Sequence, residues 1–349
     1  DLICDHTSGY YGKYKLLPTL VQLQSDITSP FPPLDLMVHI GEISAASFND
    51  TIPAKEVWRV SEDGELRDPF KKLTTVFQMS EEMFFLHYGK DGCNRHVLID
   101  ECRELFGEIY EQIPELPFCN IWTAMQLSSR LPKGALFHMG VSNTRRCWNM
   151  FQLPESVESA CNVGCCGIDG CVSTLVGASL VNPDRLCYVV VGDLTFFYDL
   201  NSLGNHHIGT NLRVMLVNNG RGTEFRLGIH HCNVFGDDAD KYMAAAGHFG
   251  NKSPLLVKHY AEDLGFHYLS ATTKEEFMTA LSNFTNPQLS DHSMILEVFT
   301  DSKDESEALY LMSHIQSDAK GMVRSKLKDA VRNVAGEKGI NAIKKILEK

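Results

Sequence analysis

Short apolar runs recur along the second half of the chain, separated by stretches of mixed polarity. Runs this short and rich in Val, Leu and Ile are typical of the buried strands of a parallel sheet. The stretches between them have helical patterns, and this alternation predicts a doubly wound α/β sheet with helices on both faces. The predicted strands cover residues 135–138, 187–191, 212–217, 266–269 and 294–299.

The beginning of the chain has a similar pattern on a smaller scale. Strand-like runs lie at 36–40, 56–60 and 74–78, and helical patterns lie at 14–23 and 80–86. Ser80 precedes two glutamates and resembles a helix start. These elements predict a second, smaller α/β domain.

A stretch with two prolines, 113–118, marks the expected boundary between the two domains. The sequence therefore predicts a smaller domain over 1–112, a main domain over 113–300 and a charged helical tail over 301–349. An apolar stripe among lysines in the tail predicts a surface helix that packs on its own domain. The alternative is a helix that docks a partner or lies on a membrane surface. The stripe consists of Leu327, Val331, Val334 and Ile343.

Two of the predicted strands end in polar pairs, Gly192-Asp193 and Asn218-Asn219, with 24 residues between the pairs. The intervening stretch is long enough for a crossover helix, so right-handed β-α-β geometry places both strand ends side by side on one edge. In open α/β sheets the ligand crevice lies outside these carboxyl ends. A carboxylate and a carboxamide there form an oxygen site suited to Mg²⁺, which keeps positions for substrate phosphate oxygens. We expect a phosphate-bearing ligand bound through a metal.

Composition limits the class of protein. The chain has 349 residues, 44% hydrophobic and 22% charged, which is typical of globular domains. A formal charge of −12 argues against nonspecific binding to nucleic acid or anionic membranes. The sequence has no apolar run of membrane-spanning length and no signal peptide at its beginning, so we expect a cytoplasmic protein. Residue 1 is Asp, which leaves open a natural start further upstream.

The chain contains 11 cysteines, many of them in apolar runs, and we expect buried, reduced thiols. A cluster of Cys161, Cys165, Cys166 and Cys171 suggests a zinc site at first sight. Its spacings do not form two CxxC motifs and no histidine lies nearby, so packing is the favoured interpretation.

Residues 164–170 form a glycine-rich turn before 172–179, which has the pattern of a helix start. Glycines permit close backbone approach to a ligand, and the free N–H groups at a helix N-terminus favour anions. Together with the two polar pairs, this turn supports a phosphate site.

The segment from Gly220 to Lys252 has many Gly, His and Asp residues and no clear period. It is long for a connection, so we expect a mobile active-site segment or an irregular insertion. Adjacent histidines in a strand point in opposite directions and are poor joint ligands, although proton transfer by one of them stays open. The histidines considered are His206, His207, His230, His231 and His248.

Gly192-Asp193 through Asn218-Asn219 resembles the thiamine diphosphate signature, although most members have Gly where this chain has Leu194. The Gly-Ile-Asp-Gly-x-x-Ser-Thr run at 167–174 and the run at 198–203 narrow the resemblance. The chain is similar to the 2-succinyl-5-enolpyruvyl-6-hydroxy-3-cyclohexene-1-carboxylate synthase family (MenD-type) from about residue 119 to 300. Upstream, 5–9 and 38–42 resemble the middle domain of that family with lower specificity.

The resemblance implies a thiamine diphosphate-binding fold, a smaller Rossmann-like middle domain, and thiamine diphosphate with Mg²⁺ as cofactors. Asp193 and Asn219 would bind Mg²⁺ through side-chain oxygens, and the Arg221 carbonyl would add a third ligand. Thr195 would contact the diphosphate. The remaining residues that the resemblance assigns to the cofactor are Gly167 and Ile168 at the aminopyrimidine, with Asp169, Gly192, Leu194 and Phe225.

The resemblance assigns substrate-binding residues less directly than cofactor-binding residues. Ser142 and Arg146 match a family segment that contacts substrate, and a guanidinium suits a carboxylate. The alternative is a helix-capping Ser and a surface Arg. Val163 stands where the family has a substrate-contacting Arg, and Glu224 where it favours an apolar residue. Both departures suggest a different acceptor and different pocket chemistry.

The resemblance implies an enzyme that decarboxylates a 2-oxo acid and transfers the carbanion equivalent to an acceptor, as a carboligase of the transferase or lyase class. Its activating Glu is expected on a pyrimidine domain, upstream or on a separate subunit, so we expect this chain alone to be inactive. A homodimer or homotetramer is expected. The alternative is a noncatalytic scaffold or regulatory subunit. A different nucleotide-phosphate binder is a weaker alternative, because the chain has no Walker or dinucleotide motif.

Overall fold

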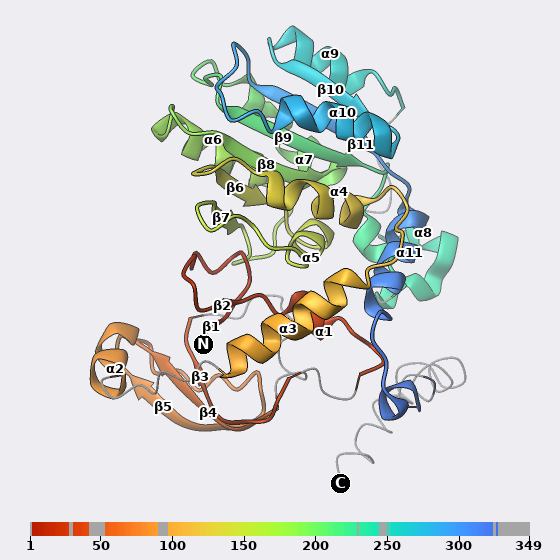
Figure 1. Cartoon of the computed structure of the whole chain (residues 1–349). Coiled ribbons are helices and arrows are strands. Elements are labelled where there is room, and N and C mark those ends of the chain that lie inside the picture. The colour runs from red at the N-terminus through yellow and green to blue at the C-terminus, as the bar shows by residue number, and fades with distance from the viewer. Residues whose placement is uncertain are drawn as a thin grey trace. The chain divides into compact units, whose positions relative to one another are not determined.

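Parallel strands form the main sheet of the protein (Figure 1). The computed structural model describes residues 2–27, 31–41, 53–89, 97–228, 230–243, 250, 252–323 and 326. Within these residues the sheet has six strands, in the order β10-β11-β9-β8-β6-β7, and all of its pairs are parallel. The strands are β6 (Leu136–Met139), β7 (Glu158–Cys161), β8 (Cys187–Gly192), β9 (Leu212–Asn218), β10 (His267–Ala271) and β11 (Met294–Phe299). The predicted parallel α/β class is confirmed, whereas β7 was not predicted.

Helices cover both faces of this sheet. On one face, an apolar cluster joins α6, α7 and α9 to inward residues of the central strands, such as Val191 and Leu216. On the other face, the ring of Tyr188 contacts Phe284 of α10, and Phe137 contacts Trp148 of α5. The helices are α4 (Asn120–Leu127), α5 (Asn143–Trp148), α6 (Cys171–Val181), α7 (Asp193–Asp199), α9 (Leu256–Asp263) and α10 (Lys274–Phe284).

A second sheet lies in the smaller unit, with β3 (Leu34–His39), β4 (Ala54–Ser61) and β5 (Leu73–Gln78) in parallel. Helices α2 (Glu81–Tyr88) and α3 (Val97–Glu111) follow it. Its three predicted strands and the helix at 80–86 are confirmed. The Ser80 Oγ accepts a hydrogen bond from the Met83 N–H at 3.3 Å, as expected of a helix N-cap.

The predicted helix at 14–23 is wrong in its first half. Residues Lys15–Leu16 form the short strand β2, which pairs with β1 (Leu2–Ile3), and helix α1 covers only Thr19–Gln22. The physical reason is Pro18, which has no backbone N–H and disfavours helical geometry at the residue before it.

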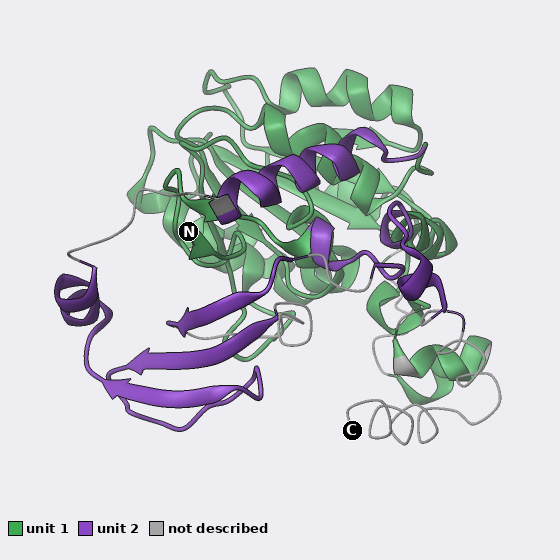
Figure 2. Ribbon diagram, turned by 60° about the horizontal axis from the view of Figure 1, so that its bottom comes forward, with its two compact units in different colours: residues 1–19, 115–311 green, residues 20–114, 312–349 purple. Residues whose placement is uncertain are grey.

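Contacts divide the chain into two units, one of residues 1–19 and 115–311, the other of 20–114 and 312–349 (Figure 2). The first residues therefore group with the main sheet, whereas the sequence places them in the smaller domain. The contacts of His6 account for this grouping. Its backbone N–H donates to Asn149 Oδ1 at 3.0 Å, its Nε2 lies 2.8 Å from Phe151 O, and its carbonyl accepts from Ser159 Oγ at 2.6 Å.

Helix α11 (Ser302–Ser313) begins the predicted tail, and the contacts place it up to Leu311 with the main sheet. The predicted apolar stripe at 327–343 lies outside the described residues. The predicted irregular segment after β9 consists, where it is described, of the 3₁₀ turns η3 (Thr223–Arg226) and η4 (His231–Asp238) and the short α8 (Ala239–Tyr242).

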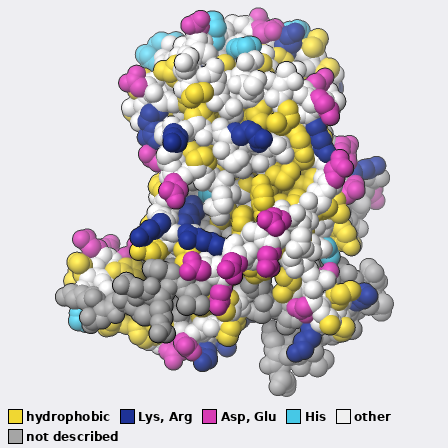
Figure 3. Space-filling model, in the orientation of Figure 1, with side chains coloured by type: hydrophobic (Ala, Val, Ile, Leu, Met, Phe, Trp, Pro, Cys, Tyr) yellow, Lys and Arg dark blue, Asp and Glu magenta, His cyan; other side chains and the backbone are white. Residues whose placement is uncertain are grey.

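The described surface mixes charges of both signs. In Figure 3, Lys and Arg side chains (dark blue) are interspersed with Asp and Glu side chains (magenta) on the face shown. Among the helices that the structure describes, none combines the length and the apolar character needed to cross a membrane.

The carboxyl ends of β6 and β8 approach closely at Gly140. Its N–H donates to Val190 O at 2.7 Å. A Cβ at this position would lie 3.2 Å from Val190 O and 3.3 Å from Val191 Cα. Both atoms belong to the backbone of a buried strand, so a Cβ at position 140 would strain this close approach and glycine avoids the strain.

We therefore expect Gly140→Ala to lower the free energy of unfolding by about 1–3 kcal/mol through overpacking. Gly177 is the matched control, because it is exposed inside α6 and a Cβ there meets no atom within 4 Å. Gly177→Ala should raise the free energy of unfolding by about 0.5–1 kcal/mol. Equilibrium urea unfolding measures both, and equal effects of the two substitutions would contradict the close-approach argument.

Candidate functional site

The topology of the main sheet places the predicted site residues at one edge. The chain passes from β6 to β7 on one side, then returns to β8 on the other side of β6. The carboxyl ends of β6 and β8 therefore mark a topological switch point, where open α/β sheets bind their ligands. Residues 140–146 follow β6, 162–170 follow β7, and Asp193 follows β8.

Asp193 joins the ends of β8 and β9. Its carboxylate is 2% exposed. One oxygen accepts hydrogen bonds from the N–H groups of Asn219 at 3.2 Å and Gly220 at 2.6 Å, and the other accepts from the Leu194 N–H at 2.8 Å. Gly220 has a φ of 80°, a left-handed conformation that favours glycine. The predicted meeting of the two strand ends is confirmed, and the metal-binding roles stay a prediction.

The donors at this edge fit Mg²⁺. Asp193 supplies a carboxylate and Asn219 a carboxamide, whose Oδ1 lies 3.4 Å from the Arg221 N–H. The carboxylate and carboxamide oxygens are hard ligands of the kind that Mg²⁺ prefers. The backbone amides fix the Asp193 carboxylate in one orientation. Among the described residues, no three His, Cys, Asp or Glu side chains form a cluster that would hold a metal by themselves.

A buried acid beneath this edge was missed by the sequence analysis. Glu297 of β11 is 1% exposed and accepts hydrogen bonds from Asn218 Nδ2 and the Tyr268 hydroxyl, each at 2.7 Å. Burial raises the pKa of the Glu297 carboxyl, and the negative charge of Asp193 raises this pKa further. Its signal was a single acidic residue within an otherwise apolar run, Met294–Phe299.

The glycine-rich turn leads into α6 at Cys171, one residue before the predicted helix start. Gly170 occupies the N-cap with a φ of 76°. The next turn of helix is joined to α7, because the Ser173 N–H donates to Asp199 Oδ2 at 2.7 Å. Within the turn, Gly167 and Ile168 are half-buried and Asp169 is exposed.

Two cysteines of this turn contradict the expectation of buried thiols. Cys165 and Cys166 are exposed, whereas Cys171 is buried at the start of α6. Residues 164–166 of the turn are exposed, so the side chains of these two cysteines do not pack on the sheet. The Cys166 thiol donates to Val163 O at 3.3 Å, and the described cysteines are free of disulfides.

The side chains of Arg146 and Glu224 form a bidentate ion pair. Arg146 Nη1 donates to one Glu224 oxygen at 2.9 Å, and Nη2 donates to the other at 2.6 Å. The two side chains are 24% and 21% exposed. Burial lowers the pKa of the Arg146 guanidinium, but the hydrogen bonds and charge of Glu224 outweigh burial and raise the pKa overall. Arg146 is therefore a half-buried, ion-paired arginine, and its role toward a substrate stays a prediction.

Ser142 occupies the N-cap position of α5, with a φ of 61° and a ψ of −123°. Its side chain makes no capping hydrogen bond, so the alternative of a helix-capping Ser is wrong. A non-glycine residue in this region is strained by its Cβ. The strained turn places Ser142 one helical turn before Arg146, whose N–H donates to Ser142 O at 3.1 Å.

Asn143 links Arg146 to a buried acid in α11. The Asn143 Oδ1 accepts a hydrogen bond from Arg146 Nη1 at 3.4 Å, and its Nδ2 donates to Glu305 Oε2 at 3.4 Å. Glu305 also accepts hydrogen bonds from the Asn120 N–H at 2.9 Å and the Thr300 hydroxyl at 3.2 Å. Burial raises the pKa of the Glu305 carboxyl to about 7, although these hydrogen bonds lower it.

The candidate histidines fall in different environments. His206 and His207 are exposed, and His230 accepts a hydrogen bond from the Cys232 N–H at 3.1 Å while its ring contacts Phe225. His248 and the side chain of His231 lie outside the described residues. His138 of β6 was missed. It is buried, and burial lowers its pKa to about 4.

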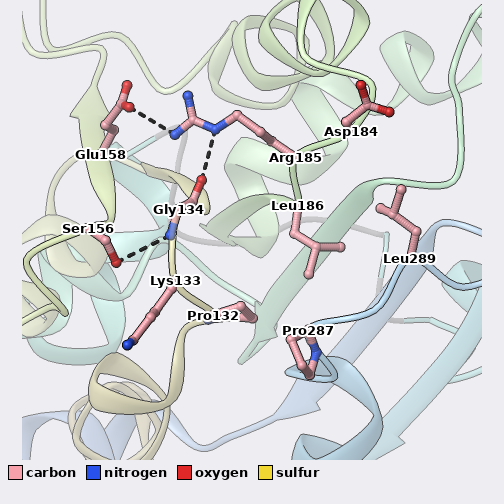
Figure 4. A pocket seen from close by; sticks show the side chains of 10 residues that line it. All are labelled: Pro132, Lys133, Gly134, Ser156, Glu158, Asp184, Arg185, Leu186, Pro287 and Leu289. Atoms are coloured by element: carbon pink, nitrogen blue, oxygen red, sulfur yellow. Dashed lines mark hydrogen bonds and ion pairs between the residues drawn. The ribbon is translucent and has the colours of Figure 1, made fainter.

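A cavity of about 460 Å³ lies at the opposite edge of the sheet, where the chain enters β6, β7 and β8 (Figure 4). One wall is an ion pair between Arg185 and Glu158 at 2.9 Å, and Arg185 Nε also donates to Gly134 O at 2.8 Å. This cavity is separate from the switch point, because it lies at the amino ends of the strands. It is lined by Pro132, Lys133, Gly134, Ser156, Glu158, Asp184, Arg185, Leu186, Pro287 and Leu289.

Comparison with known proteins found relatives with one shared name, although no family model matches the chain. The 2-succinyl-5-enolpyruvyl-6-hydroxy-3-cyclohexene-1-carboxylate synthase of Bacteroides fragilis is 33% identical over 263 residues, which cover 74% of this chain and 45% of that protein. Proteins of the same name from Phocaeicola vulgatus and Bacteroides thetaiotaomicron are each 32% identical, over 265 and 259 residues. These two alignments cover 74% of this chain and 44% of each relative. The chain thus spans less than half the length of these curated relatives.

The raised pKa of Glu305 predicts a pH-dependent stability. Its carboxyl has a pKa of about 7 in the folded chain against an ordinary value of 4.5. Between these values the folded state keeps a proton that the unfolded state releases, so this contribution to stability falls as the pH rises. Glu305→Gln cannot lose a proton, and the wild type should lose about 3 kcal/mol relative to it between about pH 5 and pH 8.

Equilibrium urea unfolding of both proteins across this range measures the difference. Buried His6 and His138 have pKa values lowered to about 4, so their contributions rise with pH in both proteins and cancel. Glu307 is exposed on the same helix, and Glu307→Gln should follow the wild type at every pH. A pH-independent difference between the wild type and Glu305→Gln would show that Glu305 is not the titrating group.

Proposed function

Because this chain belongs to the 2-succinyl-5-enolpyruvyl-6-hydroxy-3-cyclohexene-1-carboxylate synthase family, we propose that it is the diphosphate-binding portion of a thiamine diphosphate- and Mg²⁺-dependent enzyme. The enzyme decarboxylates a 2-oxo acid and transfers the carbanion equivalent to an acceptor. Thiamine diphosphate, when bound, supplies the site that accepts the electron pair left by decarboxylation. The chain supplies binding, orientation and charge.

The orientation of Asp193 carries this proposal. Three backbone N–H groups from two strand ends fix its carboxylate at the carboxyl edge of the sheet. In the proposed complex Asp193, Asn219 and the Arg221 carbonyl bind Mg²⁺. A metal held there would carry the positive charge that both the Asp193 carboxylate and the diphosphate need. A buried acid can therefore lie where an anionic ligand is expected.

The proposed cofactor residues come from three segments of this edge. Thr195 is buried in the first turn of α7 and is proposed to contact the diphosphate. The glycine-rich turn before α6 is proposed to receive the aminopyrimidine through Gly167 and Ile168. The other proposed contacts are Asp169, Gly192, Leu194 and Phe225.

Turnover is proposed to need a second domain. The resemblance places the activating Glu on a pyrimidine-type domain, and the chain spans 45% of its Bacteroides fragilis relative. We propose that this domain is supplied by the same polypeptide upstream or by another subunit, in a homodimer or homotetramer. The substrates are proposed to be a 2-oxo acid and a small-molecule acceptor.

A noncatalytic scaffold or regulatory subunit is the second candidate. The observation that favours it is the engagement of Arg146 by Glu224, because a substrate carboxylate can bind this guanidinium only by displacing the one already bound. Val163, in place of the expected Arg, removes a second cation from the same site. The two candidates differ in whether the chain binds the cofactor.

Thermal denaturation of the chain with thiamine diphosphate and Mg²⁺ tests the proposed function. A ligand at about 100 times its dissociation constant stabilises the folded state by about 2.7 kcal/mol, so the Tm should rise by several degrees. The rise should require both components and disappear with EDTA. Asp193→Ala and Asp193→Asn should abolish it, because each removes the carboxylate that binds the metal.

Asp184 is the matched control, since it lies just before the other end of β8 and is exposed. Asp184→Ala should keep the full increase in Tm. An equal cofactor-dependent increase in Asp193→Ala would reject the assigned metal site. No increase in the wild type, together with none when a pyrimidine-type domain of a relative is added, would favour the scaffold.

A further inference from the structure

We propose that Glu224 is a specificity-determining residue that competes, as an internal carboxylate, with ligand carboxylates for Arg146. This inference rests on the proposed function, since it takes Arg146 to face the substrate site. It goes further in assigning a role to Glu224.

The geometry of the pair is that of a bound carboxylate. Both terminal nitrogens of Arg146 donate to Glu224, one to each oxygen, at 2.9 Å and 2.6 Å. Two parallel hydrogen bonds of this kind are the arrangement by which guanidinium groups recognise carboxylate ligands. Arg146 Nη1 also donates to Asn143 Oδ1 at 3.4 Å, so both nitrogens have partners inside the chain.

Glu224 comes from a different segment than Arg146. Arg146 lies in α5 after β6, whereas Glu224 lies in the 3₁₀ turn η3 after β9. The pair therefore spans the carboxyl edge of the sheet, across the strand end that holds Asp193. Gly222 precedes η3, and the buried Leu227 follows it, so the turn that presents Glu224 is four residues long and anchored in the core at its end.

Competition follows from the energetics of exchange. A ligand carboxylate that binds Arg146 in the same way must first displace Glu224. The exchange replaces one pair of charge-assisted hydrogen bonds with another, and it leaves the Glu224 carboxylate, which is 21% exposed, without its partner. An unpaired charge that is largely removed from water is costly. The chain therefore binds carboxylates at Arg146 more weakly than the same site without the internal acid.

The position of Glu224 also predicts selectivity by charge. A ligand with an ester or ketone in place of the carboxylate does not need Arg146 and does not compete with Glu224. Glu224 thus lowers the preference for an anionic ligand relative to its neutral analogue. This effect differs from a loosening of the fold, which would change the affinity for both ligands alike.

Binding of pyruvate and its neutral analogue methyl pyruvate to the full chain tests the proposal, measured by ligand-observed NMR titration. Glu224→Gln keeps the shape of the side chain and removes its charge. We expect this substitution to tighten pyruvate binding on the order of tenfold while methyl pyruvate binding stays unchanged. In the double variant Arg146→Gln with Glu224→Gln, the gain for pyruvate should disappear.

Glu158 provides the matched control, because it forms an Arg–Glu ion pair with Arg185 at the opposite edge of the same sheet. Glu158→Gln should bind both probes as the wild type does. Unchanged pyruvate binding in Glu224→Gln would overturn the proposal. Weaker pyruvate binding would also overturn it, because Glu224 would then position Arg146 for the ligand.

The outcome is separate from that of the proposed function. The cofactor experiment depends on Asp193 and needs no carboxylate ligand, whereas the pyruvate titration needs no cofactor. A Tm increase with thiamine diphosphate together with unchanged pyruvate binding in Glu224→Gln would retain the function and reject the competition. A charge-selective gain without any cofactor effect, also after addition of a pyrimidine-type domain, would retain the competition and reject the function.

Discussion

The hydrogen bonds of the Asp193 carboxylate are the interaction on which the candidate site depends. They join the first turn of α7 to the backbone after β9, so one side chain determines how two strand ends face the switch point. Burial of a carboxylate is costly unless charge-assisted hydrogen bonds compensate it. Three backbone donors provide that compensation and also fix the direction of the oxygens. Mg²⁺ coordination requires this kind of preorganisation, since the ion demands nearly ideal octahedral geometry.

Two further acids organise the same edge from within. Glu297 fixes Asn218, the neighbour of Asn219, and Glu305 reaches Arg146 through Asn143. The edge therefore combines these buried acids with the bidentate pair of Arg146 and Glu224. The formal charge of the whole chain is −12. A bound divalent cation would relieve part of this accumulated negative charge. The proposed metal site and the proposed competition of Glu224 with ligand carboxylates thus both depend on the negative charge at this edge.

Much of the main sheet was predictable because its strands are buried on both faces. A strand of this kind must be apolar along its whole length, as in the run before Asp193, so it stands out in the sequence. The edge strand β7 (Glu158–Cys161) alternates buried and exposed residues over four positions and was missed. The helix predicted at 14–23 was wrong in its first half. The apolar and polar residues there have helical spacing, but Pro18 interrupts the backbone hydrogen bonds that a helix needs. The meeting of Asp193 with Asn219 was predictable, since β-α-β connections have one hand.

The sequence by itself determined the class of fold, the family, and the edge at which polar residues gather, because periodicity and motif spacing are local properties of the chain. The tertiary structure decided which side chains on that edge neutralise one another. Arg146 and Glu224 are 78 residues apart, and Asn218 and Glu297 are 79 apart. Pairs so distant in sequence meet only once the strands are ordered in the sheet. The charge that a ligand meets at this edge is a property of those pairs, so residue identity alone could not reveal it.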